Sequence, residues 1–152
     1  MKIIIISFIV LIGVSLQSCK KEDLSINLPT QEEMWSCHHQ NDWDTTKMKN
    51  ELSGKWKWVF TQNYWNPTEG RNTEDKHIEI EFANDSILNI IENDTIIHSA
   101  KWSIVLKDDD LFGIEFDSSV SLLHGRILIC GNTLEFNNTY LDGDDNYFLR
   151  TE

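Results

Sequence analysis

Basic residues are scarce in this sequence. The 152 residues include 13 Lys and Arg against 25 Asp and Glu, which gives a formal net charge of −12. Because nucleic-acid phosphates are bound by faces rich in Lys and Arg, this balance argues against a nucleic-acid partner. The sequence also lacks a nucleophile elbow, a glycine-rich phosphate loop and a zincin motif. We therefore predict no catalytic residues and no cofactor, and we do not expect an enzyme.

Residue types that bind metals are present, but their spacing is wrong. The run from Asp142 to Asn146 is acidic, yet an EF-hand loop would need Gly at its sixth position, where Tyr147 stands. The adjacent His38 and His39 point apart in an extended chain, and no second His or Cys pair stands nearby at ligand spacing. We predict no metal site.

A hydrophobic run long enough to cross a membrane is also missing. The apolar stretch from Ile3 to Leu16 has 14 residues, whereas a helix needs roughly 20 to span a bilayer. It follows the basic Lys2 and precedes a small residue, a pattern typical of a secretory signal peptide. A transmembrane anchor is the alternative interpretation, and the signal peptide is favoured.

The end of this stretch, Leu16-Gln17-Ser18-Cys19, resembles the bacterial lipobox. The resemblance implies cleavage before Cys19, lipidation of its thiol, and anchoring as an outer-membrane lipoprotein of the cell envelope, facing either the periplasm or the surface. We predict three parts: a signal peptide (1–18), a lipidated tether (19–36) and a folded domain (37–152).

The number of cysteines is odd, which requires an explanation in an exported chain. If Cys19 carries lipid, Cys37 and Cys130 remain, and an oxidising compartment favours a disulfide between them. Two buried free thiols are the alternative.

Alternating apolar and polar residues dominate the sequence after Gly54. Before them, residues 44–54 predict one short helix with Asp44 or Thr45 as its cap. The alternation predicts an all-β fold, and Asn84-Asp85 and Asn93-Asp94 predict tight hairpins. The strand segments are 55–60, 77–82, 86–91, 95–106, 111–116, 119–123, 126–130, 134–136 and 146–150. About eight antiparallel strands in up-and-down order favour a closed β-barrel, with a β-sandwich as the alternative.

The motif Gly54-Lys55-Trp56 follows the predicted helix and opens the first strand, and Arg150 ends the last one. These features resemble lipocalins and the lipocalin-like domains of small bacterial lipoproteins. The resemblance implies that Arg150 stacks on Trp56 at the closed end of the barrel. It also implies a small apolar ligand inside the barrel, with Trp58, Phe60, Phe82 and Trp102 as candidate ligand-binding residues.

Two functions follow from these predictions. The first is a membrane-anchored, lipocalin-like module that binds a small apolar ligand in the barrel or at its mouth. In the second, the same side chains fill the barrel, and the protein is a surface or structural module that meets a protein or a glycan through its loops. The aromatic residues expected at such a surface are Trp35, Trp43, Tyr64 and Trp65.

Overall fold

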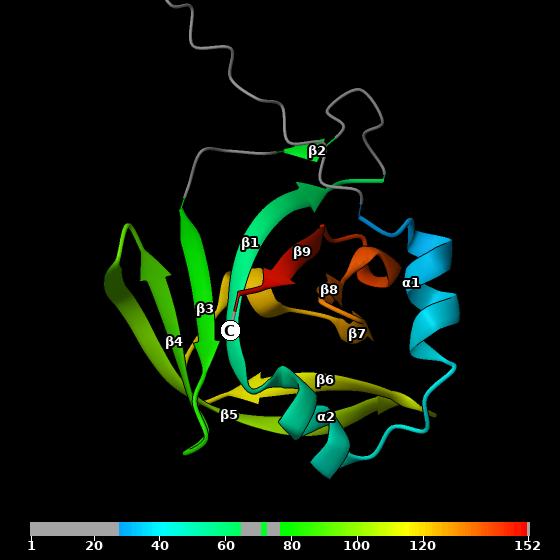
Figure 1. The fold of residues 1–152 in the computed structure, drawn as a ribbon, viewed down its shortest axis with the longest axis horizontal. Coiled ribbons are helices and arrows are strands. Elements are labelled where there is room, and N and C mark those ends of the chain that lie inside the picture. The colour runs from blue at the N-terminus through cyan, green and yellow to red at the C-terminus, as the bar shows by residue number, and fades with distance from the viewer. Residues whose placement is uncertain (1–27, 65–70, 73–76, 152) are drawn as a thin grey trace, which may run out of the picture.

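The computed structural model describes residues 28–64, 71–72 and 77–151 (Figure 1). The predicted signal peptide, Cys19 and Trp65 lie outside the described residues. The strands are β1 (Gly54–Gln62), β2 (Arg71–Asn72), β3 (Ile78–Phe82), β4 (Ile87–Glu92), β5 (Thr95–Asp108), β6 (Leu111–Phe116), β7 (Arg126–Cys130), β8 (Thr133–Asn137) and β9 (Asp145–Arg150). The α-helices are α1 (Gln31–His38) and α2 (Thr45–Leu52), and two 3₁₀ turns span Ser121–Leu123 and Thr139–Leu141.

The strands form one up-and-down antiparallel sheet that curls into a nearly closed barrel. Their order is β6-β5-β4-β3-β1-β9-β8-β7, with the short β2 paired to β1. The first strand, β1, pairs with β3 on one side and with the last strand, β9, on the other. The first and last strands of the barrel therefore lie next to each other. The seam lies between β6 and β7, which contact each other at the two ends of the strand order. The predicted eight-stranded barrel is therefore confirmed.

Turn chemistry explains most of the meander. Asn93 and Asp94 both have positive φ, 49° and 62°, as the tight turn between β4 and β5 requires. Ser86 has a φ of 66° and its N–H donates to the carbonyl of Ala83, which closes the turn between β3 and β4. Both predicted hairpins are confirmed.

The strand predicted at residues 119–123 is wrong, because residues 121–123 form a 3₁₀ turn at the seam between β6 and β7. Val120 and Leu123 both bury their side chains in the core. A spacing of three residues between inward side chains suits a 3₁₀ turn, whereas a strand would need a spacing of two.

The predicted helix at 44–54 is present as α2, capped by the Asp44 side chain, which accepts a hydrogen bond from the Lys47 N–H at 2.8 Å. Its buried Met48 and Leu52 pack into the barrel core, and α2 itself lies beside β5 at the bottom of Figure 1. The sequence analysis expected only this helix, and it assigned residues up to 36 to the tether.

A second helix, α1, begins inside the predicted tether. Thr30 and Glu33 form a capping box at its start. Met34 and His38 are buried, and the helix packs against β7 on the right of Figure 1. Only these two inward residues mark its buried face in the sequence, so the periodicity was too weak to predict it.

The apolar core has two layers. The larger fills the barrel and receives side chains from α2 and from every strand except β2. The smaller lies outside the barrel, between α1 and the strands β1, β6, β7 and β9; its buried members are Met34, Phe60, Leu111, Leu128 and Tyr147. Helix α1 thus covers one outer face of the barrel.

Candidate functional site

Three of the four predicted ligand-binding residues point into the barrel. Trp58, Phe82 and Trp102 belong to the interior cluster and are 8%, 1% and 4% exposed. Trp58 Nε1 donates to Asn146 Oδ1 at 3.2 Å, and the rings of Phe82 and Trp102 meet edge to face at 5.0 Å. The first contact holds the Trp58 ring against β9, and the second holds the Phe82 and Trp102 rings against each other.

Phe60 does not point into the barrel. A β-bulge between Trp58 and Phe60 shifts the register of β1 against β9, so that Trp58 lies opposite Phe148 and Phe60 opposite Tyr147. An extra residue in one strand reverses the faces of all residues beyond it. Phe60 therefore stacks on Tyr147 at 4.5 Å, in the outer layer under α1. The prediction that Phe60 faces inward is wrong.

Of the hollows found among the described residues, none is lined by more than one of the three interior rings. Trp102 lines one hollow of about 270 Å³, which it shares with the exposed residues Lys101, Glu115 and Asp117 on the β5–β6 hairpin. That hollow lies at the surface, and the described barrel interior is packed with side chains.

Arg150 and Trp56 meet as the lipocalin resemblance implies. The guanidinium carbon of Arg150 lies 4.2 Å from the centroid of the buried Trp56 ring. Arg150 also donates to the carbonyls of Ser53 and Glu51, which end α2. Gly54 follows with a φ of 116°, a conformation that favours glycine, and so turns the chain from α2 into β1. The predicted contact is confirmed.

The predicted disulfide between Cys37 and Cys130 is also confirmed, with Cα atoms 5.5 Å apart. It joins the last turn of α1 to the end of β7. A second link lies beside it, because the Ile129 N–H donates to His38 Nδ1 at 3.1 Å. The outer helix is thereby fixed to the edge strand of the barrel.

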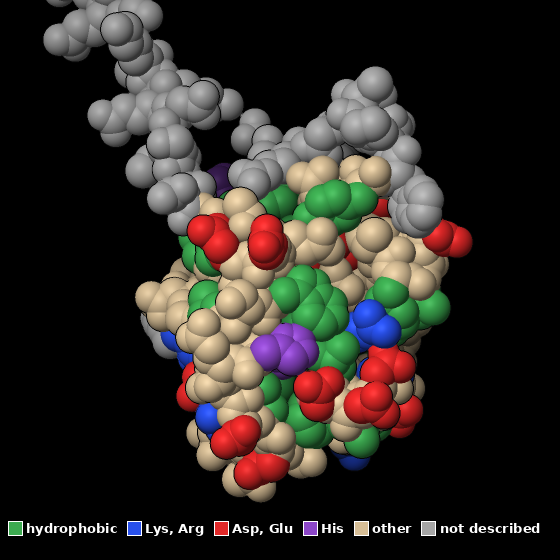
Figure 2. All heavy atoms as spheres, turned by 90° about the vertical axis from the view of Figure 1, so that its right-hand side faces the viewer, with side chains coloured by type: hydrophobic (Ala, Val, Ile, Leu, Met, Phe, Trp, Pro, Cys, Tyr) green, Lys and Arg blue, Asp and Glu red, His purple; other side chains and the backbone are tan. Residues whose placement is uncertain are grey.

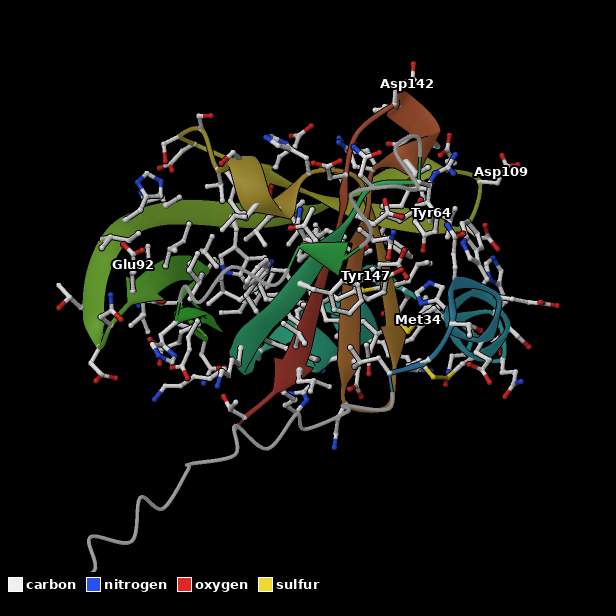
Figure 3. The ribbon with its side chains drawn as sticks, turned by 90° about the horizontal axis from the view of Figure 1, so that it is seen from above. Met34, Tyr64, Glu92, Asp109, Asp142 and Tyr147 are labelled. Carbon is white, nitrogen blue, oxygen red and sulfur yellow. A yellow bond between two sulfur atoms is a disulfide. The ribbon has the colours of Figure 1, made fainter. Side chains whose placement is uncertain are left out.

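The outer layer contains a polar cluster that the sequence analysis did not predict, formed by Glu135, Asn137, Asp145 and Tyr147. All four side chains are buried. Asn137 Nδ2 donates to Glu135 and to Asp145, each at 3.1 Å, while Glu135 Oε2 has no hydrogen-bond partner. Figure 3 shows Tyr147 close to Tyr64 and Met34, and the two Tyr hydroxyls lie 3.2 Å apart.

Burial controls the acidity of this polar cluster. Desolvation raises the pKa of Glu135 to about 7, and the nearby Asp145 contributes to the increase. Desolvation also raises the pKa of Asp145, although the N–H groups of Asn138 and Thr139 donate to its carboxylate and oppose the shift. The pKa of Tyr147 is raised as well, mainly by burial. The carboxyl groups are sealed from solvent, and the bond from Asn137 to Asp145 links β8 to β9.

Local sequence did not distinguish these acids from exposed ones. Glu135 stands between Leu134 and Phe136, so it has the outward position of any polar residue in an alternating strand. Its register partners Leu128 and Tyr147 pack with Met34 of α1 in the outer layer, and that helix was not predicted. Asp145 belongs to the acidic run from Asp142 to Asn146, and it is buried at the start of β9.

The aromatic residues expected at a binding surface differ in exposure. Tyr64 is exposed, whereas Trp35 and Trp43 are half-buried beside α1. Trp43 stacks on His38 at 4.9 Å, and Trp35 stacks on His39 at 5.2 Å. The two indoles thus line the region around the C-terminal end of α1.

Residues 28–64, 71–72 and 77–151 contain no group of three His, Cys, Asp or Glu side chains placed to hold a metal ion. Neither α1 nor α2 has the length and apolar character to cross a bilayer, and these are the α-helices of the described residues. Comparison of the chain with known protein families, with curated proteins and with solved structures finds no match.

Proposed function

We propose that this protein is a lipid-anchored lipoprotein of the cell envelope whose lipocalin-like barrel is filled, and that it binds its partner through its outer surface. The observation that carries the proposal is the burial of Trp58, Phe82 and Trp102 in one packed cluster. Sites for small apolar ligands are concave cavities of roughly 300–1,000 Å³. The described hollows of that size, of about 330 and 480 Å³, are not lined by Trp58, Phe82 or Trp102.

The Arg150–Trp56 stack supports the lipocalin resemblance of the architecture. The disulfide supports an oxidising compartment, since such bonds persist outside the cytosol. The Cys19 anchor rests on the lipobox resemblance and on the cysteine count. Of the three cysteines, the Cys37–Cys130 bond leaves Cys19 without a disulfide partner in the sequence.

An apolar-probe titration tests the filled interior. We expect dodecanoate to leave the NMR signals of interior methyl groups, such as those of Leu88 and Leu134, unchanged. The Phe82→Ala variant titrated with benzene is the positive control, because a cavity left by a large buried ring can accept benzene. Saturable shifts of the interior methyl groups of the unaltered protein would contradict the proposal.

Anchoring needs a separate test. Mass spectrometry of the N-terminal peptide should show acyl chains on Cys19, and Cys19→Ser should release the protein from the membrane fraction. An unmodified Cys19 in membrane-bound protein would contradict the anchor and leave the filled barrel untouched.

A further inference from the structure

A small pocket lies where the C-terminal end of α1, the following loop and the β5–β6 turn meet. It has a volume of about 240 Å³ and is lined by His38, His39, Asn41, Asp42, Trp43 and Asp110. We refer to it as the α1-end pocket. Figure 2 faces the α1 side of the molecule and shows hydrophobic and His side chains bordered by Asp and Glu, with few Lys or Arg.

The innermost residue of the α1-end pocket is His38, which is 1% exposed. Its Nδ1 accepts the N–H of Ile129 at 3.1 Å, and a backbone N–H can only donate. Burial lowers the pKa of His38 to about 4, so the ring is neutral near pH 7. A neutral ring whose Nδ1 accepts must carry its proton on Nε2.

The Nε2–H of His38 is therefore a donor, and it has no hydrogen-bond partner in the described structure. A buried donor without an acceptor destabilises the folded state. An occupant that supplies an oxygen acceptor would remove this destabilisation. The same assignment excludes His38 as a metal ligand, because Nε2 has no lone pair while Nδ1 accepts from Ile129.

The rim of the α1-end pocket is held in place by its own contacts. Trp43 stacks on His38, and its Nε1 donates to the His38 carbonyl at 2.8 Å. The Lys47 ammonium lies 4.9 Å from the centroid of the Trp43 ring and donates to Asn41 Oδ1 and to the Asp42 carbonyl. Asn41 Nδ2 donates to the Cys37 carbonyl at 3.4 Å. Both ends of the Asn41 amide are thus engaged.

The remaining polar groups of the rim are the carboxylates of Asp42 and Asp110. Both residues are exposed. Asp110 Oδ2 lies 3.7 Å from His39 Nε2, while His39 Nδ1 donates to the Trp35 carbonyl at 2.8 Å. Carboxylates only accept hydrogen bonds near neutral pH. The α1-end pocket thus combines one buried donor with two acceptors of negative charge.

Few chemical groups satisfy this combination. An anionic ligand would find the His38 donor, but Asp42 and Asp110 would repel it. A cation would be attracted to the carboxylates but would face the His38 N–H. A hydroxyl group accepts from His38 and donates to a carboxylate, and neighbouring hydroxyls on one ring can do both at once.

We infer that the α1-end pocket binds a neutral polyhydroxylated ring, such as a terminal sugar of a glycan, with one hydroxyl on His38 Nε2 and others on Asp42 and Asp110. The pocket is smaller than the roughly 300–1,000 Å³ of sites for drug-sized ligands, so it suits a single ring. This inference rests on the proposed function, because it gives the outer surface of the filled barrel a site and a class of ligand.

Saturation-transfer NMR on the full processed protein tests this inference. The protein is kept in a detergent without a sugar headgroup. The probes are the methyl glycosides of glucose, mannose, galactose and N-acetylglucosamine. We expect at least one probe to bind and to shift the indole N–H signal of Trp43, which a Trp43→Phe variant identifies.

Three variants localise the binding. Asp42→Asn combined with Asp110→Asn should weaken it about tenfold or more, because each charged acceptor is replaced by an amide. His38→Asn keeps an oxygen acceptor for Ile129 but removes the Nε2 donor, and it should weaken binding comparably. Asp109→Asn is the matched control, because Asp109 lies at the periphery in Figure 3 and does not line the pocket; it should change affinity less than about twofold. Near-UV circular dichroism confirms that each variant is folded.

Two outcomes would overturn the inference. One is the absence of saturation transfer to any of the four glycosides with folded protein. The other is binding that all the variants retain or lose to the same degree, which would put the ligand elsewhere. Neither outcome affects the filled barrel, which fails only if an apolar probe binds in the interior.

Discussion

Glu135→Gln isolates the energetic effect of the buried polar cluster. Glu135 is 0% exposed, its Oε1 accepts from Asn137, and its Oε2 has no partner. Burial holds its pKa at about 7, above the ordinary 4.5. Gln has nearly the same shape and no charge at any pH, so the substitution removes the titration and keeps the packing.

Proton linkage gives the sign of the change in the free energy of unfolding with pH. Between the unfolded pKa of 4.5 and the folded value of about 7, the native state binds more protons than the unfolded state. The Glu135 contribution to stability is therefore present at low pH and is lost as pH rises through this window. The shift corresponds to about 3 kcal/mol. Relative to the unaltered protein, Glu135→Gln should thus gain about 3 kcal/mol in free energy of unfolding between about pH 4 and pH 8.

The titration of His38 changes the free energy of unfolding in the opposite direction, both in the unaltered protein and in the Glu135→Gln variant. Its pKa is lowered from 6.5 to about 4 by burial, so the unfolded state binds the extra proton within that window. Stability from this group is lost as pH falls. The two contributions nearly cancel in the unaltered protein, and the difference between variant and unaltered protein is therefore the quantity to measure.

Urea denaturation at a series of pH values supplies that difference. Glu115→Gln is the matched control, since it makes the same chemical change at an exposed position on the barrel. A Glu135→Gln difference that is flat, or that falls with rising pH, would refute the argument that Glu135 is buried without a compensating charge.

Three further variants test the packing, each by urea denaturation. Removing the 93-residue linkage with Cys37→Ser and Cys130→Ser should cost about 4–5 kcal/mol in the chain-entropy model, and an unchanged midpoint would mean that the thiols are not joined. Arg150→Met should cost about 2–3 kcal/mol, because a stacked guanidinium and its bonds to helix carbonyls are lost; a cost below about 0.5 kcal/mol would contradict that contact. Phe82→Ala should cost about 3–5 kcal/mol through the cavity it leaves, and a neutral effect would mean that the interior is loosely packed.

The barrel was predictable because its strands repeat one local signal. Alternation with a period of two marks the two faces of each strand, and residues such as Asn93 and Asp94 supply the positive φ that tight hairpins need. The meander and its closure follow from these two features. The contact of Trp56 with Arg150 was predictable only through the family resemblance, since the two residues are 94 positions apart.

The remaining features depend on tertiary context. The β-bulge that moves Phe60 to the outer face arises from the pairing of β1 with β9, which no property of residues 58–60 indicates. Helix α1 has a weak apolar pattern and is stabilised by its contacts with β7. The outer layer beside Glu135 and the α1-end pocket both include residues of α1, so they were hidden from the sequence for the same reason.

A barrel filled by its own side chains carries no interior ligand. Native mass spectrometry of the processed protein, compared with its denatured and unreduced mass, measures whether it does. We expect a native mass equal to the denatured mass, which includes the covalent lipid and is two hydrogens below that of the reduced chain. A native excess that disappears on denaturation and belongs to an apolar compound would contradict the filled barrel.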